Sequence, residues 1–134
     1  MSPKSVIKKK VVVKPQKIPD KDHLYKRVHK IHVINGKLNL GMVFINIDGG
    51  MSTDWSKFST PNKTRDRVIE NNKNPHDFGV IIMKVKLVRE IKDQLVIHTP
   101  DNIKNNPAHT DVTGEKDAEA QVLFNRISTW AIKI

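Results

Sequence analysis

Short apolar runs separated by turn residues predict that most of this chain forms antiparallel strands. The first run lies within residues 28–34, and a near-alternating run follows over 38–47. Asn35-Gly36 lies between them, and both residues tolerate the positive φ that a tight hairpin turn requires. A further short strand is predicted over 51–55, after an Asp-Gly-Gly turn. These patterns favour a mostly antiparallel sheet.

The most apolar segment, FGVIIMKVKLVREI, covers residues 78–91. Its apolar residues alternate, so they can share one buried face of a strand. A single strand of this length would extend ~45 Å at about 3.3 Å per residue, whereas a domain of this size is only about 35 Å across. We therefore expect a break near Val85, a bend or short helix over 85–92, and a further strand over 94–98.

Two helices are predicted. The first is weak and polar; it begins at Thr60-Pro61 and extends through Ile69, because threonine caps a helix and proline fits its first turn. The second follows Gly114 and carries acids in its first turn, where the helix dipole favours them. We expect its buried face to hold Ala118, Val122, Ile127 and Trp130. The predicted fold class is α+β, with a mostly antiparallel sheet of about five strands, one weak middle helix and a packed C-terminal helix.

Length and composition favour one compact domain with a basic arm. The chain has 134 residues and 37% hydrophobic content, which leaves no room for two substantial cores. Residues 1–19 are rich in Lys, Val and Pro, and their three prolines exclude a continuous helix. We expect residues 1–19 to form a flexible basic arm and residues 20–134 to form a single α+β domain.

The positive charge is concentrated near the N-terminus. The formal net charge is +10, and residues 1–30 contribute +8, because they hold ten Lys or Arg against two acids. Residues 31–134 hold fourteen against twelve and contribute only +2. Phosphate binding depends on charge density within a Debye length of roughly 8 Å. This distribution favours RNA or DNA as a partner of the arm; a solubilising tail is the alternative.

The candidate nucleic-acid contacts begin with the cations Lys8, Lys9, Lys10, Lys14, Lys26 and Arg27. Trp55 is a further binding candidate, because an exposed indole can stack on a base. The alternative for Trp55 is a place in the core, which is the common position of a large aromatic side chain.

Other classes of site are disfavoured. The chain has no cysteine, so it holds no disulfide and no thiolate metal site. His29 and His32 would point to opposite faces of the predicted strand, and no nucleotide-cofactor motif occurs, so we expect neither a metal nor a cofactor. The run Val11 to Val13 is far shorter than the about 7–15 apolar residues of a signal-peptide core, and no stretch approaches the ~20 residues that span a bilayer. We expect a soluble, cytoplasmic protein without membrane contact.

The stretch VIHTPDNIKNNPAHTDVTG holds the candidate catalytic residues. Two dipeptides, His98-Thr99 and His109-Thr110, flank a polar connection. Two histidines with pKa values near 6.5 can serve as base and acid at one phosphodiester. Thr99, Asn106 and Thr110 could donate hydrogen bonds to its phosphate oxygens. The alternative is a polar turn, in which Asp and Asn side chains bond their own backbone.

Several short motifs occur in a recognisable order along the chain. They are Leu-Tyr-Lys-Arg-Val at 24–28, Met-Ser-Thr-Asp-Trp at 51–55, Ser-Thr-Pro at 59–61, Phe-Gly-Val at 78–80 and Asn-Pro-Ala-His at 106–109, with Gly114 and Lys116 after them. The order resembles a set of short prokaryotic proteins of unknown function, with a Leu-x-Arg-Arg opening, Met-Ser-Val-Asp before Thr-Pro, and a late Asn-Pro-Ala-His. Lys26 and Thr53 depart from that pattern. The resemblance implies that these segments hold the functional site, and it implies no activity.

Three functions remain open from the sequence. The first is a nucleic-acid-associated binding module that uses the basic N-terminal arm. The second is a small metal-independent hydrolase or nuclease that acts through His98 and His109. The third is a partner-binding protein of a regulatory or conflict system.

Overall fold

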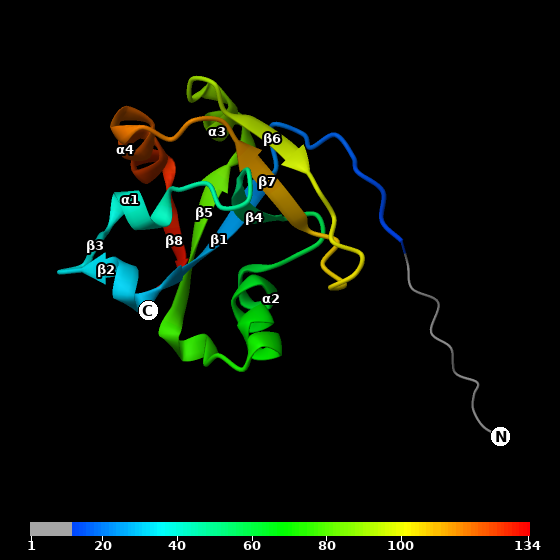
Figure 1. Cartoon of the computed structure of the whole chain (residues 1–134), viewed down its shortest axis with the longest axis horizontal. Helices are drawn as coiled ribbons and strands as arrows, with labels where there is room; N and C mark the ends of the chain where they lie inside the picture. Colours follow the sequence, from blue (N-terminus) through cyan, green and yellow to red (C-terminus); the bar gives the residue numbers. More distant parts are fainter. Residues whose placement is uncertain (1–11) are drawn as a thin grey trace.

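A six-stranded antiparallel sheet forms the centre of the molecule (Figure 1). The computed structural model describes residues 12–134. The strands of the sheet are β1 (His23–His29), β4 (Met51–Trp55), β5 (Phe78–Lys84), β6 (Leu95–His98), β7 (His109–Thr113) and β8 (Thr129–Ile132). Their order is β6-β7-β4-β1-β5-β8. The predicted α+β class is confirmed, with six strands in place of about five.

Short helices and one hairpin surround the sheet. The α-helices are α1 (Leu40–Val43), α2 (Pro61–Asp66), α3 (Val85–Glu90) and α4 (Ala118–Ile127). The 3₁₀ helices are η1 (Lys30–His32), η2 (Arg67–Asn71) and η3 (Pro75–Asp77), and the hairpin joins β2 (Val33–Ile34) to β3 (Lys37–Leu38). Among residues 12–134, no helix is long and apolar enough to cross a membrane.

Three local predictions are confirmed. The Thr60 hydroxyl accepts a hydrogen bond from the Lys63 N–H (3.2 Å) and caps α2, which continues into η2 as the weak middle helix. Asn35 and Gly36 have φ values of 52° and 75° at the tip of the β2–β3 hairpin. The apolar segment over 78–91 breaks at Val85, where β5 ends and α3 begins.

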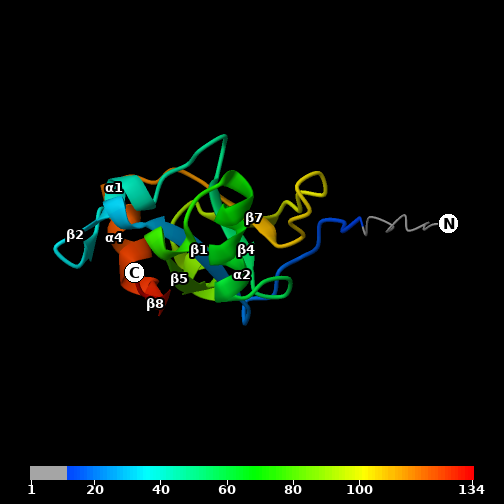
Figure 2. The same ribbon diagram turned by 90° about the horizontal axis from the view of Figure 1, so that it is seen from below.

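The hydrophobic core lies on one face of the sheet. Alternating positions of β1, β4, β5 and β7 contribute Leu24, Val28, Met51, Trp55, Met83 and Val112. Helices α1, α3 and α4 cover this face, and α1 and α4 lie side by side (Figure 2). The rings of Phe44, next to α1, and Phe124, on α4, stack with centroids 5.5 Å apart. On the opposite face, β5 contributes the apolar side chains Phe78, Val80 and Ile82, β4 contributes Ser52 and Asp54, and α2 covers the β1 and β5 part.

Two strand predictions are wrong. The first strand lies at 23–29, not within 28–34, because this segment pairs with β5 over all seven of its residues. Residues 38–47 do not form a strand: α1 occupies 40–43, and this turn buries Val43 and Phe44 against the core. The near-alternation over 38–47 therefore reflects a short helix packed on one side, which alternation alone does not distinguish from a strand.

The C-terminal helix is packed as predicted, but on another face. Ala120 and Phe124 are buried, whereas Val122 is 48% exposed. Trp130 lies in β8 after the helix ends, and it packs on the edge of the core from there. A helix that ends at Ile127 breaks the spacing on which the predicted face depended.

The sheet is split along its middle. β1 pairs with β4 only at Leu24–Trp55 and Tyr25–Asp54, although β4 stays paired with β7 over 51–54. Lys26 would pair with Thr53 next in this register, but the two strands have separated by then. In Figure 1, β1 and β5 run toward one side below this junction and β4 and β7 run toward the other, and α2 packs against β1 and β5.

Residues 12–19 of the expected arm are held on the domain. Val13 exchanges two hydrogen bonds with the Asn102 side chain (3.0 and 3.1 Å), and the Gln16 N–H donates to His98 Nδ1 (3.0 Å). Ile18 is only 1% exposed and belongs to the core. Lys14 is exposed. The candidate contacts Lys8, Lys9 and Lys10 lie outside the described residues.

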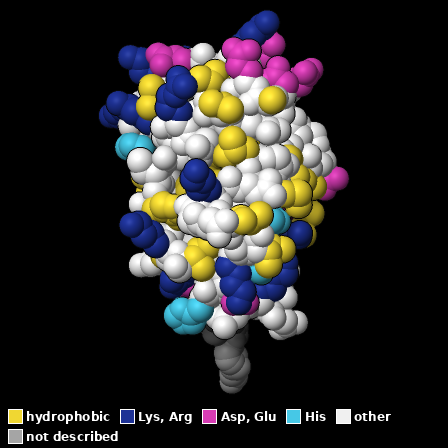
Figure 3. Space-filling model, turned by 90° about the vertical axis from the view of Figure 1, so that its left-hand side faces the viewer, with side chains coloured by type: hydrophobic (Ala, Val, Ile, Leu, Met, Phe, Trp, Pro, Cys, Tyr) yellow, Lys and Arg dark blue, Asp and Glu magenta, His cyan; other side chains and the backbone are white. Residues whose placement is uncertain are grey.

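Charge is unevenly distributed over the surface that Figure 3 shows. Acidic side chains gather at the end of the molecule where α3 and α4 lie. Lys, Arg and His side chains are scattered over the rest of this face, between apolar and uncharged polar side chains.

We predict that Ile18→Ala lowers the free energy of unfolding by about 3 kcal/mol, because it deletes a buried apolar side chain next to the sheet. Val12→Ala is the matched control; its side chain is 65% exposed, so its effect should stay within about 0.5 kcal/mol. Urea unfolding of both variants tests this. Equal stabilities would show that residues 12–19 do not contribute to the core.

Candidate functional site

A cleft of about 590 Å³ opens where β1 and β4 separate. Residues 25–29 of β1 and 52–54 of β4 line its floor. Its walls come from α2 with η2, from the segment around α1, and from the connection between β6 and β7. Because the two strands pair again at Tyr25–Asp54, the cleft ends at that junction. The cleft therefore brings β1, β4 and the connection between β6 and β7 together.

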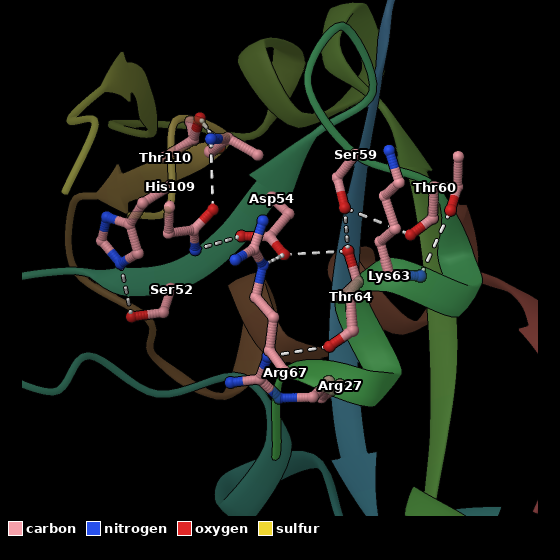
Figure 4. A network of polar contacts seen from close by, with 12 residues as sticks. Arg27, Ser52, Asp54, Ser59, Thr60, Lys63, Thr64, Arg67, His109 and Thr110 are labelled. Carbon is pink, nitrogen blue, oxygen red and sulfur yellow. Dashed lines mark hydrogen bonds and ion pairs between the residues drawn. The ribbon is translucent and has the colours of Figure 1, made fainter. Parts of the chain in front are cut away.

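Asp54 is the centre of a polar network on the cleft wall (Figure 4). Its carboxylate is buried, with the residue 4% exposed. The Thr64 hydroxyl donates to Oδ2 (2.8 Å) and the Asn106 amide donates to Oδ1 (3.0 Å). Arg67 Nε lies 3.5 Å from Oδ2. One carboxylate thus joins β4 to α2, to η2 and to the turn before β7.

Arg27 and Arg67 lie on the Asp54 side of the sheet, whereas Lys26, the residue before Arg27 on β1, faces the same side as Leu24 and Val28. Arg27 is held by a hydrogen bond from its guanidinium to the Thr64 carbonyl (2.9 Å). Burial lowers the pKa of Arg27, Arg67 lowers it further, and Asp54 and Glu70 oppose this shift. The ammonium group of the Lys26 side chain makes no hydrogen bond or ion pair with any residue in 12–134. Its burial, with repulsion from Arg27 and from Lys116, lowers the pKa of Lys26 to about 8.

His109 is held in a defined orientation beside the cleft. Its Nδ1 lies 3.1 Å from the Thr99 carbonyl and 2.9 Å from the Thr99 hydroxyl. A carbonyl only accepts, so Nδ1 carries the proton and donates it to Thr99. Nε2 is then free to accept from the Ser52 hydroxyl at 3.3 Å, and Asp111 Oδ1 lies 4.0 Å from the same nitrogen. This is the arrangement of a serine, a base and a group that orients the base.

His98 lies on the other face of the sheet. It pairs with Thr110, so its side chain and that of His109 project in opposite directions. His98 is 2% exposed and its ring lies against Trp55 and Phe58. Its Nδ1 accepts from Gln16, and Nε2 therefore donates to the Pro107 carbonyl (2.7 Å). The structure does not bring the two histidines to a common substrate atom, and its contacts give His98 a structural role.

The polar connection between the two histidines forms the turn that was the alternative to a catalytic site. Asp101 Oδ1 accepts from the Lys104 N–H (3.0 Å), and Asn106 Oδ1 accepts from the Ala108 N–H (3.1 Å). Asp101 and Asn106 also pair through their backbones. These side chains stabilise the turn, while the amide of Asn106 reaches Asp54.

Other candidate binding residues are engaged within the chain. Trp55 is in the core, and its indole N–H donates to Asp22 (2.8 Å), so the side chain is not presented to a base. Thr110 is buried and donates to the Ala108 carbonyl (3.0 Å), and Thr99 contacts His109. Of the sequence candidates within the described part of the chain, only Lys26, Arg27, Asn106 and His109 line the cleft.

Sequence reasoning assigned no role to four residues of this site, namely Ser52, Asp54, Thr64 and Arg67, although the first two lie within the 51–55 motif. A signal was present for the first two: Ser52 and Asp54 are the polar alternate positions of a strand, so they share one face. The alternation of the strand places the side chains of Ser52 and Asp54 on the same face. It does not indicate which helix meets them, because α2 is brought to β4 only by the tertiary fold.

Comparison of the chain with protein-family models, with curated proteins and with solved structures finds no match. No group of three or more His, Asp or Glu side chains in residues 12–134 is placed to hold a metal ion.

We predict that Asp54→Ala lowers the free energy of unfolding by about 3–5 kcal/mol, because Arg67, Thr64 and Asn106 lose a shared buried acceptor. Asp66→Ala is the control: its carboxylate is 46% exposed and pairs only with the adjacent Arg65, so its effect should be below about 1 kcal/mol. Chemical denaturation measures both. If the two variants are equally stable, the network around Asp54 does not hold α2 on the sheet.

Proposed function

We propose that this chain binds nucleic acid, RNA or DNA, through a surface made of the basic arm and the split-sheet cleft. The observation that carries the proposal is the point where the arm joins the domain. Val13 is bonded to Asn102, in the same connection that lines one end of the cleft. Val13, which follows the lysines of the arm in the sequence, is therefore attached beside the cleft.

The charge of the cleft supports the same partner. Its lining holds the cations Lys26, Arg27, Arg67, Lys73 and Lys104, and the acids Asp54, Glu70 and Asp101. Asp54 is already occupied by donors of the chain, as described above. Cations that track a backbone supply most of the affinity in nonspecific nucleic-acid binding.

One wall of the cleft suits unpaired bases. Ile31, Met42 and Ile47 line it and are exposed. Apolar side chains beside a cationic floor can contact the faces of bases while phosphates lie on the cations. The bases of a duplex are stacked on each other, so this arrangement favours a single strand.

We predict that deletion of residues 1–11 weakens binding to single-stranded oligonucleotides and flattens its salt dependence. The deleted lysines are Lys4, Lys8, Lys9 and Lys10. At about 0.7–0.9 units of log–log slope per neutralised phosphate, loss of three contacts reduces the slope by about two. Fluorescence anisotropy across a salt series measures this.

The control replaces the same four lysines with glutamine in the full-length chain and should behave like the deletion. Both proteins keep Ile18 and Gln16, so their thermal midpoints should match that of the unmodified chain. An unchanged salt slope would remove the arm from the binding surface.

A second candidate function is hydrolysis, for which the Ser52–His109 contact is the specific observation. In this reaction Ser52 Oγ attacks the carbonyl carbon or phosphorus of an ester, and His109 Nε2 takes the hydroxyl proton. The same nitrogen then protonates the leaving alcohol, and water hydrolyses the covalent intermediate. His109 keeps the role expected from the sequence, whereas Ser52 takes the place that had been given to His98.

We predict that a fluorophosphonate probe labels Ser52, with loss of fluoride, and that Ser52→Ala and His109→Ala abolish both the labelling and ester hydrolysis. Their effects should be non-additive, because nucleophile and base act as one unit. Ser128→Ala is the control, since its hydroxyl only bonds the Phe124 carbonyl (2.7 Å). Mass spectrometry locates the label. Absence of labelling at Ser52 would rule out this second function.

A further inference from the structure

We propose that Lys26 is a nucleophilic amine that forms an imine with an aldehyde in the cleft, and that this aldehyde is the open-chain sugar of an abasic nucleotide in a bound strand. The identity of the aldehyde rests on the proposed nucleic-acid binding, whereas the nucleophilic role of Lys26 does not. Three features of the molecule support this role: the side of the sheet that Lys26 occupies, the missing partner of its amine, and its contrast with Lys116.

The cleft reaches the core side of the sheet at Lys26. Side-chain alternation along β1 places Lys26 on the same face as Leu24 and Val28. Thr53 is the β4 residue that would pair with Lys26 next in the register, but the two strands have separated there. Val28, Thr53 and, from α1, Val43 line the cleft together with Lys26. A ligand in the cleft therefore meets Lys26 at the gap between the two strands.

The surroundings of the amine are apolar or already bonded. Val28 and Val43 are 2% and 3% exposed. The Thr53 hydroxyl donates to the Thr110 carbonyl (2.9 Å). Asp54, the next residue of β4, lies on the opposite face, where the donors described above occupy its carboxylate. Within residues 12–134 the Lys26 amine has neither an acidic partner nor a hydrogen bond.

The charges that act on Lys26 favour its neutral form. Burial, followed by repulsion from Arg27 and from Lys116, lowers the pKa of Lys26 to about 8. The neutral amine is the nucleophile, and a group of pKa 8 is about 10% neutral at pH 7, against about 0.04% for an ordinary lysine. An apolar pocket and a neighbouring cation are the two conditions that activate a lysine for imine formation.

Lys116 shows that a lowered pKa alone does not make a lysine available. Burial lowers the pKa of Lys116 to about 8 as well. Its amine donates to three oxygens: Asn46 Oδ1 (2.6 Å) and the carbonyls of Val112 (2.8 Å) and Gly114 (3.0 Å). These bonds use the protons of the ammonium and leave no lone pair for attack. The two lysines therefore differ in their partners, and of the two the Lys26 amine is the one available to a ligand.

The ligand follows from the chemistry of an imine and from the proposed partner. An imine requires an aldehyde or a ketone, and an intact nucleic-acid strand has neither. A nucleotide that has lost its base has one, because its sugar opens and C1′ becomes an aldehyde. No base is attached to that carbon, so an amine can approach it. The phosphates on either side remain and are attracted to the other cations of the cleft lining.

The reaction is a condensation. The lone pair of Lys26 Nζ attacks C1′, and the carbonyl π electrons move to the oxygen. The nitrogen gives up its two protons, the oxygen leaves with both of them as water, and a C=N bond replaces the C=O bond. No electrons are gained or lost, so the step requires neither an oxidant nor a reductant.

The experiment mixes the full-length chain with a single-stranded oligonucleotide that carries one abasic site. Sodium cyanoborohydride reduces any imine to a stable secondary amine, and peptide mapping by mass spectrometry locates it. Anisotropy titrations set a protein concentration that saturates the oligonucleotide for each variant, so a lost adduct is not lost binding. We expect Lys26 to be modified at least about tenfold more than Lys116 or the exposed Lys86 of α3.

Variants at Lys26 separate the nucleophile from the charge and from the fold. Lys26→Arg keeps the charge and removes the nucleophile, so the adduct should fall at least about tenfold. Lys86→Arg is the matched control and should leave the yield unchanged. Lys26→Met should also lose the adduct, and its thermal midpoint should equal or exceed that of the unmodified chain, because it removes a charge that has no partner. An undiminished yield of adduct in Lys26→Arg overturns the inference.

The outcomes distinguish this inference from the proposed function. If the oligonucleotide binds but forms no adduct at Lys26, the inference is overturned and nucleic-acid binding stays in place. If no oligonucleotide binds but butanal with cyanoborohydride modifies Lys26 at least about tenfold more than Lys116, the nucleophilic amine is supported with a free aldehyde as its ligand, and the nucleic-acid function fails. If neither reacts and no oligonucleotide binds, both proposals fail.

Discussion

The buried carboxylate of Asp54 is the interaction on which the site depends. A charged group removed from water must be compensated by several donors, and here these come from α2, η2 and the turn before β7. The continuous α2–η2 segment and the turn before β7, some forty residues later, are therefore both fixed to one carboxylate on β4. Arg67 and, through the Thr64 carbonyl, Arg27 take their positions from this centre. The cleft is built by polar compensation on one face, while apolar packing on the other face holds the sheet.

The same arrangement places stability and function in opposition. Among residues 12–134 the Lys26 side chain has no hydrogen-bond or ion-pair partner, and burial, together with repulsion from Arg67, lowers the pKa of Arg27. Packing alone gives no reason for these charges to be there, since an apolar residue on β1 would fill the space at lower cost. A local conflict of this kind in an otherwise consistent fold is typical of a functional site.

Local features were predictable from the sequence, and long-range ones were not. The Thr60 cap and the break at Val85 follow from neighbouring residues, because caps and strand lengths are set within a few positions. The pairing of β1 with β5 depends on residues some fifty positions apart, and the sequence carries no short-range signal for it. The roles of His98, Ser52 and Asp54 depend on which face of the sheet meets α2 or the core. The alternation of each strand shows which of its side chains share a face. Which of the two faces is buried depends on the tertiary fold.

The two-pair junction between β1 and β4 gives the sheet an uneven stiffness. β1 is joined to β5 by seven residue pairs and β4 to β7 by four, so the molecule consists of two firmly connected ribbons that meet at a narrow seam. Local opening takes place where the fewest cooperative contacts must be broken. The seam is that place, and a change in the angle between the ribbons there widens or narrows the cleft without disturbing either ribbon. Changing the width of the cleft therefore breaks fewer strand pairs than any other deformation of the sheet. A ligand that bridges the two ribbons would resist this change.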